Sequence, residues 1–154
     1  MRELNQLLLE FDHDIEFNEH DYCVSNSNYL AFNLIQNWPK WERKILNVSG
    51  DTFSGKTHLA KIFQDKSNAL YLGHSDINED VFKKIKLNET IVIDDFEKIK
   101  NENLLYSLFN LIYQDNKYLL ILSKRAISEI NYSLDVLKSR EKNCIFEQIE
   151  NHDD

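Results

Sequence analysis

The amino-acid sequence predicts an α/β fold in which helices cover both faces of a mostly parallel sheet. Short, continuously apolar runs alternate along the chain with segments whose apolar residues recur at helical spacing. Runs of this kind are typical of parallel strands that are buried under two layers of helices. A phosphate-binding pattern also stands between the first expected strand and the next helix. With 154 residues, of which 42% are hydrophobic, the chain suits one globular domain.

The expected elements follow one another from residue 29 onward. The first helix has N-cap candidates in residues 25–28 and ends at Pro39, the only proline of the chain. The strongest amphipathic spacing lies over residues 103–114. Helices are expected over residues 29–38, 57–63, 77–85, 103–114, 127–131 and 134–139, and strands over residues 45–49, 69–72, 90–95, 118–123 and 143–149.

The phosphate-binding pattern is G-x-x-x-x-G-K-S/T, and two of the three glycines of the chain belong to it. Backbone N–H groups of such a loop, together with the start of the following helix, face bound phosphate. We expect Lys56 to reach the β- and γ-phosphates of ADP or ATP and the Thr57 hydroxyl to bind Mg²⁺. Phe53 is bulkier than usual at its position. The matching residues are Gly50, Asp51, Thr52, Phe53, Ser54, Gly55, Lys56 and Thr57.

Polar side chains end two later strands of the expected sheet. Asp94 and Asp95 follow an apolar strand, and Ser123 ends another. Ligands of open α/β sheets bind beyond the carboxyl ends of the strands. We expect Asp94 to hold Mg²⁺ through water, Asp95 to polarise the attacking water, and Ser123 to contact the γ-phosphate or that water. The ordinary alternatives are a solvated strand end, a helix cap and a common strand-ending serine.

Composition excludes several classes of function. A formal net charge of −8 argues against binding nucleic acid mainly through its phosphates, so we expect any contact with DNA to be indirect. The sequence has neither a membrane-spanning apolar run nor the apolar core of a signal peptide, which predicts a cytoplasmic protein without a membrane partner. Cys23 and Cys144 lie too far apart in sequence for C-x-x-C spacing, which favours reduced thiols over a disulfide or a zinc site.

A compact apolar cluster lies near the N-terminus in an otherwise polar and acidic segment. It occupies residues 6–11 and precedes Asp12, His13 and Asp14. Short apolar anchors of this kind commonly enter a pocket of a partner protein. An arm packed on its own domain is an equally good interpretation of the cluster.

The order of these motifs resembles the AAA+ domains of DnaA-related proteins. The resemblance rests on residues 22–28, the phosphate loop followed by His58 and Leu59, residues 91–95, and residues 134–140. Within that group the chain is most similar to Hda-type regulators, and residues 35–41 look like those of α-proteobacterial members. Residues 6–11 resemble the element with which such proteins bind the sliding clamp, through Gln6, Leu7, Leu9 and Phe11.

The resemblance implies a strand order of 5-1-4-3-2 and several residue roles. Tyr22, Val24 and Asn28 would lie near the adenine, and His58 would join the nucleotide-binding residues. Ser123 would match the first sensor and Arg140 the arginine finger of a neighbouring subunit's site, although Lys124 leaves the exact sensor residue open. Residues 1–20 would form the clamp-binding arm and residues 21–154 the AAA+ core. The helical lid of the family is expected to be absent.

The implied function is regulation of replication initiation. A protein of this kind binds ADP or ATP and the sliding clamp, and promotes hydrolysis of DnaA-bound ATP, within homo- or hetero-oligomers of the AAA+ type. Its own ATPase is expected to be weak. A helicase-loader- or initiator-like ATPase, a phosphotransferase and a clamp adaptor without nucleotide are the alternatives.

Overall fold

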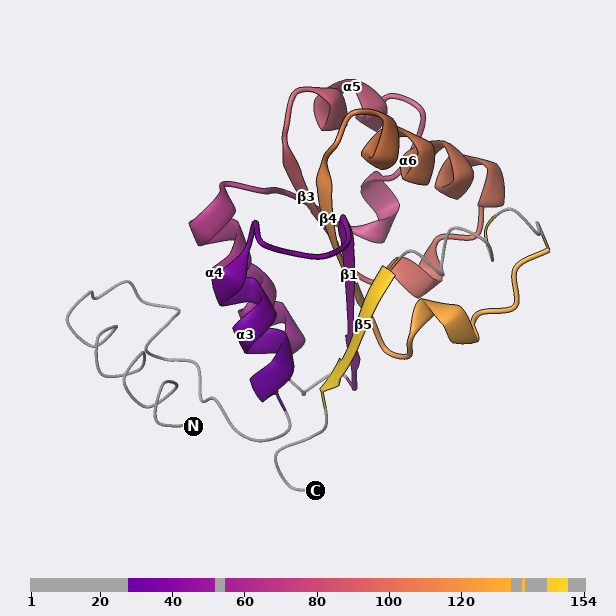
Figure 1. Cartoon of the computed structure of the whole chain (residues 1–154). Coiled ribbons are helices and arrows are strands. Elements are labelled where there is room, and N and C mark those ends of the chain that lie inside the picture. Colours follow the sequence, from indigo (N-terminus) through magenta and orange to yellow (C-terminus); the bar gives the residue numbers. More distant parts are fainter. Residues whose placement is uncertain (1–27, 52–54, 134–136, 138–143, 150–154) are drawn as a thin grey trace.

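The computed structural model describes residues 28–51, 55–133, 137 and 144–149, and these form a five-stranded sheet with helices on both faces (Figure 1). All four strand pairs are parallel, and the strand order is β2-β3-β4-β1-β5. Read from the other edge, this is the expected order 5-1-4-3-2, so the predicted fold class is confirmed. The strands are β1 (Ile45–Gly50), β2 (Leu70–Leu72), β3 (Thr90–Ile93), β4 (Tyr118–Ser123) and β5 (Cys144–Ile149).

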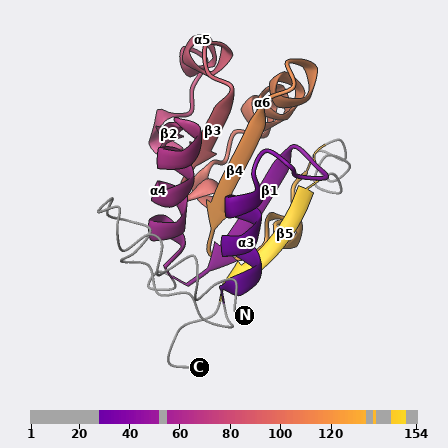
Figure 2. The ribbon, with the colours of Figure 1, turned by 60° about the vertical axis from the view of Figure 1, so that its left-hand side comes forward.

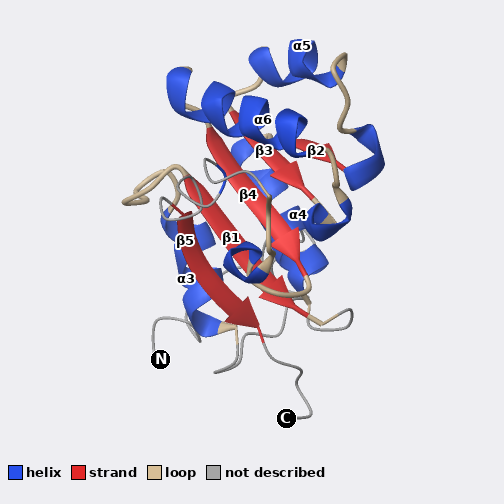
Figure 3. Cartoon of the chain, turned by 90° about the vertical axis from the view of Figure 1, so that its right-hand side faces the viewer, coloured by secondary structure: helices blue, strands red, loops and turns tan. Residues whose placement is uncertain are grey.

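The helices lie in two layers. Helices α3 (Tyr29–Asn37) and α4 (Lys56–Ser67) cover one face of the sheet, which we call the α4 face. Helices α5 (Val81–Lys86) and α6 (Glu102–Gln114) cover the other, the α6 face. Figure 3 shows α6 in front of the parallel strands with α4 behind them, and Figure 2 shows α3 and α4 on the near side of the sheet. Short 3-10 turns complete the fold: η1 (His74–Asp76), η2 (Phe96–Lys98) and η3 (Ile127–Glu129).

Side-chain alternation along the strands fills two separate cores. On β3, Ile91 and Ile93 pack on the α6 face, whereas Val92 packs on the α4 face. All three side chains are fully buried. This burial on both faces explains why the central strands read as continuous apolar runs in the sequence.

Aromatic side chains close the amino-terminal end of the sheet on the α4 face. Trp41 stacks on Phe63 of α4 with ring centroids 5.4 Å apart, and Trp38 meets the same ring edge-on at 5.8 Å. Both indoles also contact the ring of Tyr118, the first residue of β4. Aromatic pairs in this geometry add to the area that they bury. The end of α3 is thereby fixed against α4, at the end of the sheet opposite the phosphate loop.

Two of the helix predictions are wrong in length, because the helical segments are shorter than expected. The segment over residues 77–85 is α-helical only from Val81, because the Asn78 side chain accepts a hydrogen bond from the Val81 N–H at 3.0 Å and Ile77 is extended. The helix expected over residues 127–131 is the single 3-10 turn η3. Of the helix expected over residues 134–139, only Leu137 is described, and its side chain is buried.

Candidate functional site at the carboxyl ends of the strands

The parallel register brings the ends of β1, β4 and β3 to one edge of the sheet. Ser49 lies opposite Ser123, and Ile93 lies opposite Ile121. The phosphate loop leaves β1 at this edge, and Asp94 and Asp95 follow β3 there. The structure therefore groups these sequence-predicted residues along one edge, although they come from three strands.

The last residue of the phosphate loop before α4 is Gly55, whose backbone is in the left-handed region. Gly55 has φ 94°, a conformation that costs a residue with a side chain more than it costs glycine. Lys56 is only 7% exposed, and its Nζ donates a hydrogen bond to the Asp51 carbonyl at 3.1 Å. The ammonium group thus lies near the end of β1. Thr57 and His58 follow in the first turn of α4, and the Thr57 side chain is exposed, while residues 52–54 lie outside the described part.

Asp94 lies on the α4 face, where the phosphate-loop helix packs. Alternation places it on the same side as Val92, two residues earlier. Its Oδ2 accepts a hydrogen bond from the Tyr71 hydroxyl at 2.9 Å, and its Oδ1 accepts one from the Asp95 N–H at 2.8 Å. Burial and the hydrogen bond to Asp94 raise the pKa of the Tyr71 phenol above its ordinary value. Tyr71 therefore stays a hydrogen-bond donor to this carboxylate.

Asp95 turns the chain out of the sheet. Its backbone is left-handed, with φ 52°, and it precedes the 3-10 turn η2. Aspartate tolerates this conformation better than most residues. Its Oδ2 lies 3.8 Å from Nζ of Lys98 and 4.0 Å from Nδ1 of His74, which comes from the turn after β2. The carboxylate is about half exposed, so it lies within reach of solvent at the edge of the sheet.

Ser123 is fully buried and its hydroxyl is engaged on the α6 face. The hydroxyl donates a hydrogen bond to the Arg125 carbonyl at 2.7 Å and accepts one from Asn47 Nδ2 at 3.0 Å. Lys124, the other sensor candidate, is exposed, and its N–H donates to Glu97 Oε1 at 3.2 Å. In this structure the Ser123 hydroxyl and Asp94 lie on opposite faces of the sheet. A sensor role for either residue stays a prediction.

Several residues at this edge were not predicted from the sequence. Tyr71 is the one polar-tipped side chain in an otherwise apolar strand, and only the β2–β3 pairing places it beside Asp94. Asn47 is a polar residue inside β1, at a position that the pattern assigns to the core. His74 and Lys98 come to Asp95 from two different turns. Nothing in the sequence around His74 and Lys98 distinguishes these two residues from ordinary solvated surface residues.

Other predicted site residues lie at the start of α3 or outside the described chain. Asn28 is buried at the start of α3, which packs against α4 and β5. Outside the described residues lie Gln6, Leu7, Leu9, Phe11, Tyr22, Val24 and Arg140. Within the described ranges no helix is long and apolar enough to cross a membrane.

The donors at this edge fit a magnesium ion. Within the part of the chain that the structure describes, no cluster of three or more His, Cys, Asp or Glu side chains could hold a metal. Mg²⁺ in phosphate-binding sites takes one or two protein oxygens and completes its octahedron with water and phosphate. The Thr57 hydroxyl and the Asp94 carboxylate are oxygen ligands of that kind.

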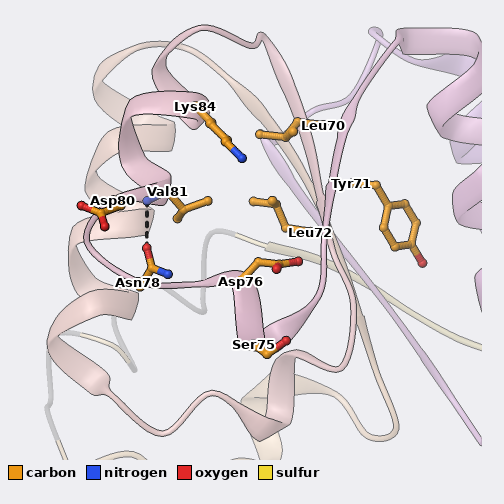
Figure 4. A pocket seen from close by; sticks show the side chains of 9 residues that line it. All are labelled: Leu70, Tyr71, Leu72, Ser75, Asp76, Asn78, Asp80, Val81 and Lys84. Carbon is orange, nitrogen blue, oxygen red and sulfur yellow. Dashed lines mark hydrogen bonds between the residues drawn. The ribbon is translucent and has the colours of Figure 1, made fainter.

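A hollow lies beside β2, away from the phosphate loop. It has a volume of about 390 Å³ and opens between the edge strand and α5. Figure 4 shows Leu72, Val81 and Lys84 pointing into it, while the ring of Tyr71 points to the other side of the strand. None of the sequence-predicted site residues lines this hollow.

No protein-family model matches the chain, whereas individual proteins do. The chain is 28% identical to the chromosomal replication initiator protein DnaA of Borrelia garinii subsp. bavariensis, over 78% of this chain and 30% of the relative. A structure of AMPPCP-bound DnaA from Aquifex aeolicus covers 85% of this chain, with 49% of its own chain matched, a TM-score of 0.71 and 18% identity. A putative primosome component from Streptococcus pyogenes matches over 82% of this chain and 81% of its own, with a TM-score of 0.61 and 17% identity.

The chain spans about 30% of the length of the curated relatives that it matches. Structural similarity at 17% or 18% identity shows the fold alone. Sequence similarity, strand order and fold nevertheless agree on one group. The chain is similar to DnaA in sequence and in fold.

Proposed function

We propose that this domain binds ADP or ATP with Mg²⁺ at the carboxyl edge of the sheet and regulates the initiation of DNA replication. One observation carries the nucleotide site: Lys56 Nζ bonds the Asp51 carbonyl, just after β1, and Asp94 faces the side of the sheet that α4 covers. An ammonium group over the phosphates and a carboxylate near the metal are the two halves of a nucleoside-triphosphate site.

Each residue at this edge has a defined task in the proposal. Lys56 leaves the Asp51 carbonyl and binds phosphate oxygens, while N–H groups at the start of α4 face the same anion. Thr57 and Asp94 would hold the metal, which would supply positive charge to the phosphates. Asp95 is exposed enough to accept a proton from, or orient, an attacking water. Asp95 Oδ2 already lies near Lys98 Nζ and His74 Nδ1, and these contacts would compete with an attacking water for the carboxylate, which supports weak intrinsic hydrolysis.

The regulatory part of the proposal rests on the sequence motifs and on the names of the relatives. The curated relatives are chromosomal replication initiators, and one matching structure is DnaA bound to AMPPCP and single-stranded DNA. We propose that residues 6–11 bind the sliding clamp and that Arg140 enters the nucleotide site of ATP-loaded DnaA. The net charge of −8 supports partners that are proteins, with DNA contacted indirectly.

A second candidate function is an initiator- or helicase-loader-like ATPase. It is favoured by the match to the putative primosome component, which covers most of both chains. Asp95 also places a carboxylate after β3, where such an enzyme needs one to act on the attacking water. Appreciable ATP hydrolysis by the purified chain without DnaA would favour this candidate over the regulator.

The experiment that tests the site is calorimetric titration with ADP and Mg²⁺. Replacing Lys56 by alanine removes the charge over the phosphates, so affinity should fall at least about tenfold, the value of a charge-assisted hydrogen bond. Lys61→Ala is the matched control, because Lys61 is exposed on the same helix and should leave affinity unchanged. A parent protein that binds no nucleotide at millimolar concentration would contradict the proposal and leave the adaptor interpretation.

A further inference from the structure

We propose that Tyr71 is a positioning residue that orients the Asp94 carboxylate for Mg²⁺. The proposal rests on the proposed function, in which Asp94 holds the metal of a bound nucleotide. It adds a residue from a neighbouring strand that no sequence motif includes. Tyr71 does not touch the ligand in this role and acts through Asp94 alone.

The first step of the argument is that both oxygens of Asp94 are held. The Tyr71 hydroxyl donates to Oδ2 at 2.9 Å, and the Asp95 N–H donates to Oδ1 at 2.8 Å. Two donors on different oxygens fix the rotation of a carboxylate about its last bond. Each oxygen keeps a further lone pair, so the carboxylate can still accept a metal-bound water. The Asp94 N–H also bonds the Leu72 carbonyl at 2.9 Å, which ties the same residue to β2 a second time.

The second step is that Tyr71 itself is held by the sheet. Tyr71 pairs with Val92 in the β2–β3 register, and its ring packs against the core of the α4 face. Figure 4 shows the ring directed away from the hollow beside α5, to the opposite side of the strand. A hydroxyl carried by a packed ring on a paired strand has little freedom to move. The donor therefore presents a fixed point to which the Asp94 carboxylate is anchored.

The third step is the size of the effect that such an anchor has on a metal site. Partners of this kind behind a metal-binding carboxylate typically contribute about 10- to 100-fold in metal affinity.

The test compares the magnesium dependence of ADP binding in Tyr71→Phe with that of the parent. Phenylalanine keeps the packed ring and removes only the donor. Without metal, in excess chelator, the two proteins should bind ADP equally. The Mg²⁺ concentration that gives half of the metal-dependent gain in affinity should rise about tenfold in Tyr71→Phe. Tyr118→Phe, at the amino-terminal end of β4, is the matched control and should leave both values unchanged.

A double-mutant cycle with Asp94→Asn assigns the effect to Asp94. Tyr71→Phe should have no further effect on the magnesium dependence once Asp94 has been replaced. An unchanged magnesium dependence in Tyr71→Phe would overturn the proposal while leaving the nucleotide site intact. Equal weakening with and without metal, or a variant that is unfolded at the assay temperature, would show a structural role and also overturn it. If the parent binds ADP without responding to Mg²⁺, the proposal fails together with the metal part of the proposed function, whereas phosphate binding through Lys56 stands.

Discussion

At the scale of single residues, Asn47 joins the first strand to the segment that follows β4. Its Nδ2 donates to the Ile121 carbonyl at 3.2 Å and to Ser123 Oγ at 3.0 Å, while its Oδ1 accepts from the Ile127 N–H at 2.9 Å. The side chain is fully buried, and its amide uses both of its ends. A buried amide satisfied in this way fixes one arrangement of its neighbours. Asn47 therefore determines where the Ser123 hydroxyl points.

Replacing Asn47 by alanine should lower the free energy of unfolding by about 1–3 kcal/mol, because the buried Ile127 N–H loses its acceptor. Urea denaturation followed by circular dichroism measures the change. Asn131→Ala is the control, since Asn131 is exposed and its replacement should change stability by less than about 0.5 kcal/mol. Equal stability of the two variants would show that this network does not stabilise the fold.

At the scale of secondary-structure elements, the ends of the helices depend on individual polar side chains. Helix α6 begins where the Asn101 side chain accepts a hydrogen bond from the Leu104 N–H at 3.2 Å. Helix α4 ends at Asn68, whose left-handed backbone directs its N–H to the Gln64 carbonyl at 2.7 Å. Such contacts satisfy backbone groups that have no partner inside the helix. They set the boundaries that apolar spacing predicted only within a few residues.

We expect Asn101→Ala to destabilise the domain by about 1 kcal/mol, because α6 loses its side-chain cap. Asn103→Ala makes the same chemical change at an exposed position inside the first turn and should be neutral or slightly stabilising, since alanine favours the helix. Thermal unfolding of the two variants beside the parent gives the comparison. Identical melting temperatures for both variants would show that this cap contributes nothing measurable.

At the scale of the whole molecule, the candidate site exists only where several strands end together. Lys56 follows β1, Asp94 follows β3, and Tyr71 lies on β2, so their association depends on the crossover connections of the parallel sheet. The proposed regulatory activity involves two further proteins. The contact with the sliding clamp is assigned to residues 6–11 and the contact with DnaA to Arg140, and both lie outside the described residues.

One assay of DnaA-bound ATP hydrolysis, with clamp loaded on DNA, separates the two proposed contacts. The double replacement Gln6→Ala and Phe11→Ala should abolish clamp binding, since such anchors each contribute about 2 kcal/mol or more. Arg140→Ala should bind clamp and nucleotide normally yet fail to stimulate hydrolysis, because a guanidinium supplied in trans is worth about 10³–10⁵ in turnover in GTPases. Arg140→Lys should fail almost as badly, since lysine lacks the planar fork.

The control for the arginine is Arg125→Ala, because the Arg125 side chain is 82% exposed on the described surface. It should stimulate DnaA as well as the parent does. Full stimulation by Arg140→Ala would exclude the arginine-finger role. Unimpaired clamp binding by the N-terminal double variant would instead favour an arm packed on its own domain.

The sequence by itself determined the layers of the fold and predicted a phosphate-binding loop. Buried strands with continuous apolar runs, helices with one apolar face and a loop of fixed spacing are local patterns, so they can be read without a structure. The boundaries of α5 and of the turn η3 were wrong because the Asn78 side chain and short-range turn geometry override apolar spacing there.

Only the tertiary structure decided which polar groups meet at the site. Tyr71 lies 23 residues before Asp94, and Asn47 lies 76 residues before Ser123, so strand pairing alone makes them neighbours. The same pairing directs Asp94 to the α4 face and Ser123 to the α6 face, a distinction that two strand-ending polar residues do not reveal in sequence. Local patterns record which side chains are buried, whereas hydrogen bonds between distant residues depend on the register of the sheet.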